Sequence, residues 1–438
     1  MMRPHFTTLR PTDDNWENVV WPVAGVFGAN ASGKSTVLDA LAYTRAVVSA
    51  SASSWLDRTQ MTRSPHLLDA HGKSSPSIYE LDFVVNGVRY EYGFSVSARG
   101  IEQEWLHDVP GTRRRTLIDR DAHRIGDEVR IGRSATPSAA LSGGVARREL
   151  VLSRAVQLEH PVLAPIAAAI TDGIQIASYD EGDRAVRLQA IVEDVFEGGM
   201  TPDEVLLLLR AADIGIEGVE VREEDLPVAL RELFERMGLA GSADKTRDGA
   251  DAEHDDPNEG AIGIPDVRRV FLFQHSGSAG GSRALRIEHE SAGTITWLSL
   301  AVPAVNALRR GSVLCVDEID SSLHPQLCAA LVGVFQDPAL NRHGAQLVFT
   351  SHDSSLLSPT SEAGLQPEQI WFTEKGHDGA AELYSLADFS PRKDENHGRR
   401  YLAGRYGAVP QLVTSHLAAL LDPTTAHPTA HVLANSQP

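Results

Sequence analysis

The sequence predicts an α/β fold that combines a mixed central sheet and flanking helices with an antiparallel β subdomain and an inserted helical arm. Three observations lead to this prediction. An apolar run at residues 23–27 precedes a glycine-rich loop and a stretch with apolar residues at helical spacing. Residues 78–94 alternate apolar and polar side chains around an Asn-Gly pair. From about residue 145 the apolar spacing becomes helical, and strand-like segments return after residue 264.

The glycine-rich loop, "GANASGKST", is the first candidate site. Its glycines, lysine and serine fit the phosphate-loop pattern G-x-x-x-x-G-K-[ST]. In such a loop, backbone N–H groups and the start of a helix surround phosphate oxygens. We expect Lys34 to reach the β- and γ-phosphates and Ser35 to bind Mg²⁺. A chance Gly/Ser-rich turn is the alternative, and the strand before and the helix after it argue against that. The predicted ATP-binding residues are Gly28, Asn30, Ser32, Gly33, Lys34, Ser35 and Thr36.

The composition sets limits on the whole chain. Its 438 residues, 42% hydrophobic and 23% charged, leave room for two or three globular domains. The net charge of −19 argues against a generally basic surface that coats nucleic acid, though it leaves room for a local basic patch. No apolar run is long enough to span a membrane and no leader is evident, so we expect a cytoplasmic protein without membrane contact. Cys315 and Cys328 lie in apolar segments, which favours buried thiols over a disulfide or a metal site.

The chain divides into four predicted parts. Residues 1–144 should form the N-terminal half of a nucleotide-binding head, with a hairpin at 78–94 and strands at 101–108 and 116–119. Residues 145–263 should form the helical arm, with one helix starting at 201–204, another at 226–237 and a disordered acidic loop at 241–263. Residues 264–410 should complete the head. Residues 411–438 should form a loose tail.

The second half of the site is expected where two apolar strands end. Val313–Val316 is followed by Asp317 and Glu318, and the next strand ends just before His352. Asp317 can hold Mg²⁺ through water, and Glu318 can orient or deprotonate an attacking water. A solvated acidic turn and a surface histidine are the alternatives when each motif is taken by itself. Next to a phosphate loop, we expect Glu318 and His352 to be catalytic.

The order of phosphate loop, acidic strand, helix and strand-histidine resembles that of ABC-type ATPases. That class also has a serine and a glycine at a helix start, which cap the γ-phosphate of the opposite subunit. Two segments offer such residues, "LSGGV" at 141–145 and "ESAGT" at 290–294. In this class the signature helix leads straight into the acidic strand, and only the second segment leaves room for just one helix and a turn before it. We therefore expect Ser291 and Gly293 to be the signature, and Ser142–Gly144 to be a flexible entry to the arm.

Five segments together, "GANASGKST", "ESAGT", "VDEIDSSLHP", "TSHD" and "YLAGRYGAVP", resemble a known family. They are similar to the ABC-class, AAA-annotated ATPases of bacterial abortive-infection and phage-defence systems, related to the ATPase part of overcoming-lysogenization-defect nucleases. The resemblance covers residues 20–410 and implies a P-loop ABC-type head that works as a homodimer with ATP and Mg²⁺ between two heads. It assigns Asp320 and Ser321 to the D-loop. It also implies a separately encoded effector, often a Toprim-like nuclease, and contact with nucleic acid only through that complex.

Three departures from the family are evident. Only 27 residues precede Gly28, and the strand that usually opens the family is not obvious, so we expect a shortened start, which leaves the adenine side of the site unassigned. No clear glutamine loop is present, since Gln60 and Gln103 both fit a structural role better. Residues 353–438 contain no Asp-x-Asp pair of a Toprim domain, so we expect this chain to cut no nucleic acid itself.

These patterns favour an ATPase whose closed dimer licenses a defence effector. The arm is expected to couple the nucleotide state to a partner, and the alternative is that its apolar helices pack only within the arm. An SMC-like DNA-repair ATPase is an alternative, but that class requires a long heptad insert with a Cys-x-x-Cys hook, which the sequence lacks. An ATP-gated scaffold with slow turnover is a further alternative. A transporter ATPase is disfavoured by the arm between the two halves of the site.

Overall fold

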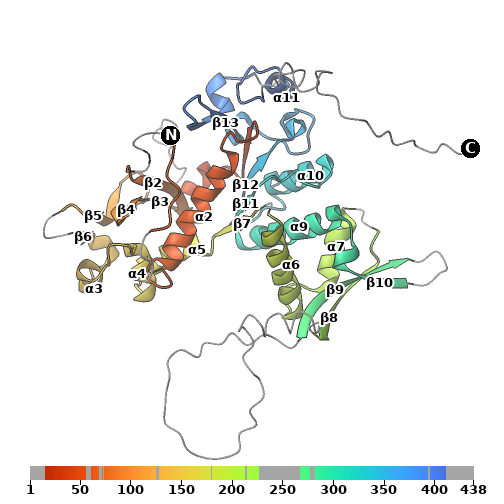
Figure 1. Ribbon diagram of the computed structural model, residues 1–438, viewed down its shortest axis with the longest axis horizontal. Helices are drawn as coiled ribbons and strands as arrows, with labels where there is room; N and C mark the ends of the chain where they lie inside the picture. The colour runs from red at the N-terminus through yellow and green to blue at the C-terminus, as the bar shows by residue number, and fades with distance from the viewer. Residues whose placement is uncertain are drawn as a thin grey trace, which may run out of the picture.

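A computed structural model describes residues 15–55, 61–68, 72, 74–124, 128–178, 180–212, 215–225, 267–276, 282–392 and 395–410. At its centre lies a six-stranded mixed sheet in the order β14-β13-β1-β12-β11-β7. All neighbours pair in parallel except β13 and β14. The strands are β1 (Val23–Gly28), β7 (Ile174–Ala177), β11 (Val313–Val316), β12 (Gln346–Ser351), β13 (Ile370–Lys375) and β14 (Ala381–Ser385). The predicted mixed sheet is thus confirmed, and β1, β11 and β12 end at one edge (Figure 1).

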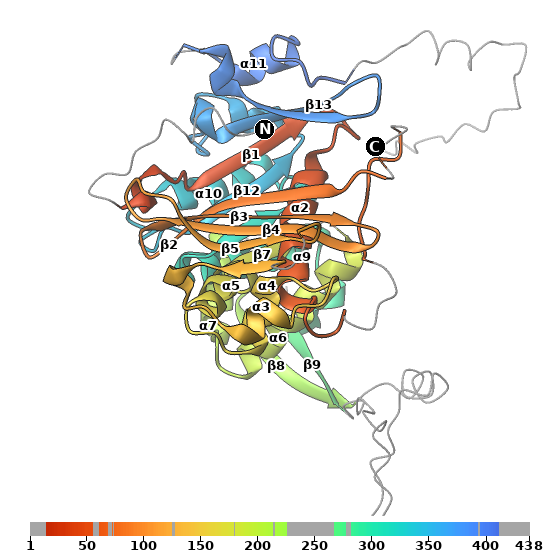
Figure 2. The same cartoon turned by 90° about the vertical axis from the view of Figure 1, so that its left-hand side faces the viewer.

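The predicted antiparallel β subdomain is a five-stranded sheet in the order β2-β3-β4-β5-β6. The turn between its first two strands has positive φ angles at Asn86 (49°) and Gly87 (75°), as a two-residue type I′ turn requires. The sheet covers one side of the molecule (Figure 2). Its strands are β2 (Ser77–Val85), β3 (Val88–Ser97), β4 (Gly100–Val109), β5 (Arg115–Asp121) and β6 (Val129–Ile131).

Two hydrophobic clusters hold these layers together. The first side of the central sheet packs on α2 (Lys34–Ala50), α4 (Val151–Gln157) and α5 (Leu163–Thr171), which the five-stranded sheet covers. The other side packs on α9 (Ala292–Arg310) and α10 (Pro325–Gln336). Because strand side chains alternate between the two faces, Cys315 of β11 joins the first cluster while Leu314 and Val316 join the second. Cys315 and Cys328 are buried free thiols, as predicted.

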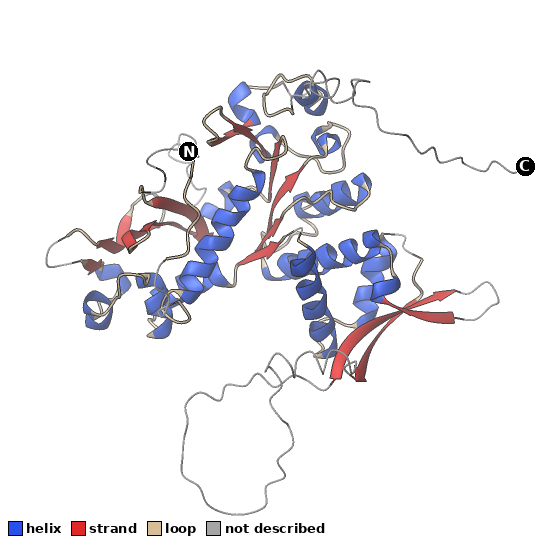
Figure 3. Ribbon diagram, viewed as in Figure 1, coloured by secondary structure: helices blue, strands red, loops and turns tan. Residues whose placement is uncertain are grey.

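The region expected to be a helical arm differs from that prediction at its start. Although the arm was expected from residue 145, β7 pairs in parallel with β11, and α4 and α5 pack on α2, so residues up to Ala177 belong to the head. Beyond β7 lie α6 (Glu181–Phe196), α7 (Pro202–Ala211) and a three-stranded sheet in the order β10-β9-β8, which also pack on α9 (Figure 3). The expected helix at 226–237 and the acidic loop at 241–263 lie outside the described residues. The three strands are β8 (Gly218–Asp225), β9 (Val267–Ser276) and β10 (Ser282–Arg286).

Helix α7 begins as its sequence predicts. Thr201 and Glu204 form a capping box, and Pro202 occupies the first turn. The run of four leucines at 206–209 predicts a helix that is apolar nearly all round and therefore buried, but Leu207 is 63% exposed while Leu209 is fully buried. The helix therefore buries one face, against α9 and β8, and presents the other outward.

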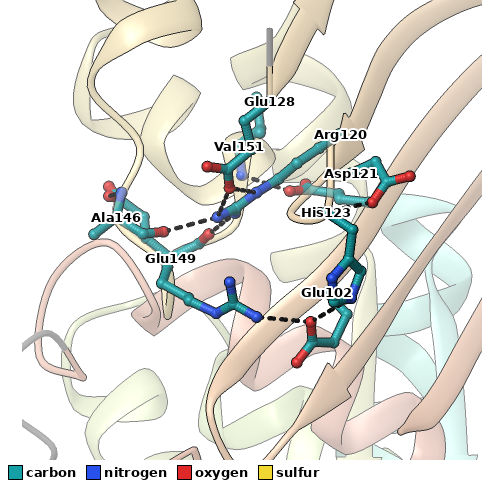
Figure 4. A network of polar contacts seen from close by, with 10 residues as sticks. Glu102, Arg120, Asp121, His123, Glu128, Ala146, Glu149 and Val151 are labelled. Carbon is teal, nitrogen blue, oxygen red and sulfur yellow. Dashed lines mark hydrogen bonds and ion pairs between the residues drawn. The ribbon is translucent and has the colours of Figure 1, made fainter. Parts of the chain in front are cut away.

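A polar network ties the five-stranded sheet to the segment that leads into α4 (Figure 4). The side chain of Arg120 is fully buried and donates to the carbonyls of Ala146 and Glu149 and to the Glu128 carboxylate. On the neighbouring strand β4, Glu104 is paired with Arg120 and accepts hydrogen bonds from two N–H groups at the start of α4. Burial raises the pKa of the Glu104 carboxyl, against the opposing pull of Arg120 and these donors. The network fixes the sheet on the helices that support the phosphate loop.

The last described segment packs on the outer part of the central sheet. In "YLAGRYGAVP", the rings of Tyr401 and Tyr406 stack on Phe372 of β13 at centroid distances of 5.2 and 5.7 Å. The predicted tail at 411–438 lies outside the described residues. No helix in the described ranges is both long and apolar enough to cross a bilayer. The short helices are α3 (Ala139–Gly143), α11 (His397–Leu402) and the 3₁₀ helices η1 (Trp16–Val19), η2 (Arg133–Ala135), η3 (Ile287–His289), η4 (Ser354–Leu357), η5 (Pro367–Gln369) and η6 (Leu386–Phe389).

Candidate functional site

A cleft of about 1500 Å³ opens beside the phosphate loop. It collects residues from parts of the chain that are far apart in sequence, because parallel strands end at the same edge of the central sheet. A smaller hollow of about 510 Å³ lies at the β2–β3 turn, away from these strand ends. The large cleft is lined by residues 30–36, Asp39, Ala40, Tyr43, 62–67, Tyr79, Glu318, His352, Lys375 and 379–381.

The phosphate loop has the backbone that its glycines predict. Gly33 has φ +104° and caps the N-terminus of α2. A Cβ atom on Gly33 would lie 2.8 Å from the Cβ of Ala381, and one on Gly28 would lie 2.5 Å from the hydroxyl of Thr373. Both positions therefore exclude a side chain, and the loop lies directly against the β13–β14 hairpin.

Lys34 is 6% exposed, and its ammonium lies within the loop. Its Nζ donates to the carbonyls of Gly28 (3.1 Å) and Ala29 (3.0 Å). Burial lowers the pKa of Lys34, whereas the carboxylates of Glu318, Asp317 and Asp320 oppose that shift. The partly desolvated Lys34 ammonium therefore lies inside the loop, where it can bind an anion such as a phosphate group.

A chain of hydrogen bonds links the loop to the acidic strand. Ser35 Oγ donates to Asp317 Oδ1 at 3.0 Å, and Thr350 Oγ1 donates to the same oxygen at 2.6 Å. The Thr350 hydroxyl also accepts the backbone N–H of Glu318 at 2.7 Å. One buried threonine therefore positions both acidic residues predicted from sequence.

Glu318 and His352 both line the cleft and lie close to one another. His352 Nε2 lies 3.9 Å from Glu318 Oε1, and the His352 N–H bonds to Asp320 Oδ1 at 3.2 Å. Glu318 has φ +50°, an unusual backbone state for a residue other than glycine, which the Thr350 contact supports. Ser321 closes the turn through its N–H to the Glu318 carbonyl. The geometry thus brings the predicted catalytic and D-loop residues together.

Ser291 and Gly293 do not line the cleft of their own chain. Ser291 is the N-cap of α9, where its hydroxyl accepts the N–H of Thr294 at 3.1 Å. Helix α9 ends at Arg310 and leads directly to β11, as the sequence predicts. A Cβ atom on Gly293 would lie 3.5 Å from the carbonyl oxygen of Ser322, so the segment adjoins the turn that follows Asp320 and Ser321.

Other residues that the sequence singles out lie elsewhere. Ser142 lies in the short helix α3, which packs beside β6 rather than at the loop. Gln103 lies on β4, paired with β3 and β5, and does not line the cleft. Gln60 lies outside the described residues.

The sequence reasoning missed several residues that lie in the cleft or are buried behind it. Thr350 stands within "TSHD", but a threonine inside an apolar strand gives no local sign of its contacts. Thr373 and Lys375 belong to a strand with no motif, and only its pairing with β1 brings them to the loop. Burial and the nearby Asp317 raise the pKa of Asp39, a carboxyl on the cleft side of α2. Tyr43, which lines the far end of the cleft, likewise carries no motif signal.

The residues present fit a nucleotide-bound Mg²⁺. The Ser35 hydroxyl and the Asp317 carboxylate are hard oxygen donors at hydrogen-bond distance from each other. Within the described ranges no group of three or more His, Cys, Asp or Glu could form a metal cage. Few protein ligands beside a phosphate loop are typical of Mg²⁺, which keeps waters and phosphate oxygens as its other ligands.

Most of the chain matches a known protein family. Residues 23–358 match the family described as "AAA domain, putative AbiEii toxin, Type IV TA system". No curated protein matches. Among solved structures, the SmcHead bound to the C-winged helix domain of ScpA is 14% identical, with 83% of this chain and 90% of that chain covered and a TM-score of 0.38. The Smc head domain with an extended coiled coil, bound to the C-terminal domain of ScpA from Pyrococcus furiosus, is 12% identical, with 84% and 91% covered and a TM-score of 0.33. At these values neither likeness says what this chain binds.

Proposed function

This chain belongs to the AAA domain family of putative AbiEii toxins of type IV toxin–antitoxin systems, and we propose that it hydrolyses ATP as a dimer and thereby controls a separate effector. Nucleotide binding by a P-loop ATPase head follows from the family and from the loop. Turnover, dimer closure and effector control are the proposed steps. The observation that carries the proposal is the hydrogen-bonded chain from Ser35 through Asp317 and Thr350 to Glu318.

The residues of the cleft divide the work of hydrolysis. The backbone N–H groups of the loop and the Lys34 ammonium would hold the phosphate oxygens. Ser35 and Asp317 would hold Mg²⁺, which when bound neutralises charge on those oxygens. Glu318 would orient a water and accept its proton on the carboxylate, and His352, 3.9 Å from Glu318, would hydrogen-bond near the terminal phosphate.

Two variants separate nucleotide binding from turnover. Lys34→Ala should abolish ATP binding, because it removes the cation that the loop buries. Glu318→Gln should retain ATP but slow hydrolysis by about 10²–10⁴-fold, the usual cost of losing a general base. Calorimetric titration with ATP and a phosphate-release assay measure the two effects. Wild-type turnover by Glu318→Gln would remove Glu318 from this role, whereas very slow wild-type turnover would favour the ATP-gated scaffold.

The dimer proposal rests on the position of Ser291 and Gly293. They lie outside the cleft of their own chain, beside the D-loop, and Ser291 is exposed at a helix start. We infer that they cap the nucleotide of a second copy. Mixing Lys34→Ala and Ser291→Arg subunits should then give mixed dimers with one intact composite site and partial ATPase activity. If mixed dimers form and show no more ATPase activity than either variant alone, then either the inference is wrong or the two composite sites hydrolyse ATP only together. Ser142→Arg is the matched control and should have little effect.

The effector proposal rests on the family description. The family description names a putative AbiEii toxin and a type IV toxin–antitoxin system, and a defence role of this kind would suit an ATPase that controls an effector. Cells carrying this gene with its neighbours should resist phage, and the Lys34→Ala version should not. Equal protection by both versions would contradict ATP control of the effector.

A further inference from the structure

The cleft contains a second lysine that the mechanism above leaves without a role. The chain contains five lysines, and the two in the described residues, Lys34 and Lys375, both line the cleft. Lys375 is exposed, and among the described residues no carboxylate lies within 4.0 Å of its ammonium. The net charge of the chain is −19, so an exposed cation beside the phosphate loop stands out as a group that is available to an anionic ligand.

The strand register directs Lys375 toward the phosphate loop. Residues two apart on a strand share a face, so Lys375 lies on the same side of β13 as Thr373. The Thr373 hydroxyl lies 2.6 Å from the Ser32 hydroxyl, inside the loop. Glu374, between them, faces the other way and lies 3.4 Å from the hydroxyl of Tyr384.

The partner strand gives the same direction independently. Lys375 pairs with Ala381 of β14, and directly paired residues lie on one face of a sheet. Ala381 is the residue that a Cβ atom on Gly33 would meet at 2.8 Å. The β13–β14 hairpin therefore forms a wall of the cleft beside the glycine that precedes Lys34, next to the start of α2 (Figure 1).

From this placement we infer that Lys375 is a second cationic contact to the polyphosphate of the bound nucleotide, supplied by the β13–β14 hairpin. The inference rests on the nucleotide site proposed above and adds a residue to it. A lysine ammonium is a compact charge on a flexible stem, well suited to phosphate oxygens that the loop does not enclose. The position beside Gly33 favours the phosphates over the base, because the loop that cradles anions lies there.

The test measures binding of ATP, ADP and adenosine by calorimetry in the presence of Mg²⁺. Lys375→Met should weaken ATP and ADP binding by about tenfold, the lower range for a charge-assisted hydrogen bond. Adenosine binding should not change, and Lys375→Arg should retain most of the ATP affinity. The loss should shrink at high salt, because the contact is electrostatic and solvent-exposed. Thermal unfolding without nucleotide should match the wild type, since the replaced side chain is exposed.

Arg310→Met is the matched control, because it removes one positive charge from an exposed position at the far end of α9. It should bind ATP as the wild type does. Suppose that the wild type binds ATP, that Lys34→Ala does not, and that Lys375→Met binds ATP as tightly as the wild type. This result would overturn the inference about Lys375 and leave the proposed function standing. If Lys375→Met weakens adenosine binding as much as it weakens ATP binding, the inference is also overturned. Absence of ATP binding by the wild type would overturn both.

Discussion

The Thr350 hydroxyl offers the sharpest test of how the acidic residues are positioned. It is fully buried, donates to Asp317 Oδ1 at 2.6 Å and accepts the Glu318 N–H at 2.7 Å. Thr350→Val keeps the shape of the side chain and removes only the hydroxyl. Both acidic residues then lose a fixed partner, while the backbone contact from the Ile319 N–H to the Thr350 carbonyl remains.

The expected cost follows from these two bonds. Leaving the Glu318 N–H without an acceptor costs about 1–3 kcal/mol, and a hydrogen bond to a charged carboxylate contributes about 1.5–3 kcal/mol. Relaxation recovers part of the sum, so we expect Thr350→Val to lower the free energy of unfolding by about 2–4 kcal/mol. Turnover should fall by roughly 10–100-fold, because small displacements of catalytic groups carry costs of that order.

Urea unfolding and steady-state ATP hydrolysis measure the two effects. Thr350→Ser is the matched control: it keeps the hydroxyl and loses a buried methyl, which costs about 1 kcal/mol. It should keep most of the turnover, whereas Thr350→Val should not. If Thr350→Val unfolds within about 0.5 kcal/mol of the wild type and hydrolyses ATP at the same rate, the hydroxyl does not position Asp317 and Glu318.

Three further outcomes follow from the structure. Burial lowers the pKa of Lys34, so the ammonium that binds phosphate loses its proton at a lower pH than an ordinary lysine would. ATP affinity should therefore decline as the pH rises toward the usual lysine pKa of 10.5, and an affinity that stays constant up to that pH would contradict this. Burial raises the pKa of Cys315 and Cys328 to about 12, so a thiol reagent at pH 8 should label both only after unfolding. Thr373→Val, which removes the hydroxyl bonded to Ser32, should weaken ATP binding by about tenfold, and Thr373→Ser should restore it, as titration calorimetry can show.

The parts of the site that sequence could predict are those written in consecutive residues. The phosphate loop needs glycine at fixed positions because Gly33 has a positive φ and Gly28 has no room for a Cβ atom. The acidic strand was placed at Val313–Val316, and the structure has the same bounds, because a short apolar run between polar turns has few alternatives. The hairpin at Asn86-Gly87 could be predicted for the same reason, because the residues that form its turn are adjacent in the sequence.

The parts that sequence could not predict depend on strand pairing across long separations. Strand β7 has only four residues, "IQIA", and lies among helices in the sequence, so it is too short for alternation to mark it as a strand. Its partner β11 comes much later in the chain, so the arm was expected to begin too early. In the same way, Thr373 and Lys375 reach the loop only because β13 pairs with β1. Short sequence patterns do not indicate which distant strands will pair.

Gly293 allows the proposed dimer to be tested by a substitution that a single chain should tolerate. A Cβ atom there would lie 3.5 Å from the Ser322 carbonyl oxygen and 3.7 Å from Ser291 Oγ, which is ordinary van der Waals contact. Gly293→Ala should leave the free energy of unfolding unchanged or raise it by up to about 1 kcal/mol, because alanine favours a helix more than glycine does.

If a second copy places its phosphates against this helix start, the added methyl group must instead obstruct that contact. Turnover should then fall by about tenfold or more, since a donor to a charged reaction centre is displaced. Gly143→Ala is the matched control: it lies in the other segment with signature-like letters, and its added Cβ atom would meet nothing within 4 Å. Loss of ATPase activity in a stable Gly293→Ala protein, with Gly143→Ala active, would show that the obstruction comes from outside the chain. Full activity in Gly293→Ala would contradict the assignment of this segment to the partner's nucleotide.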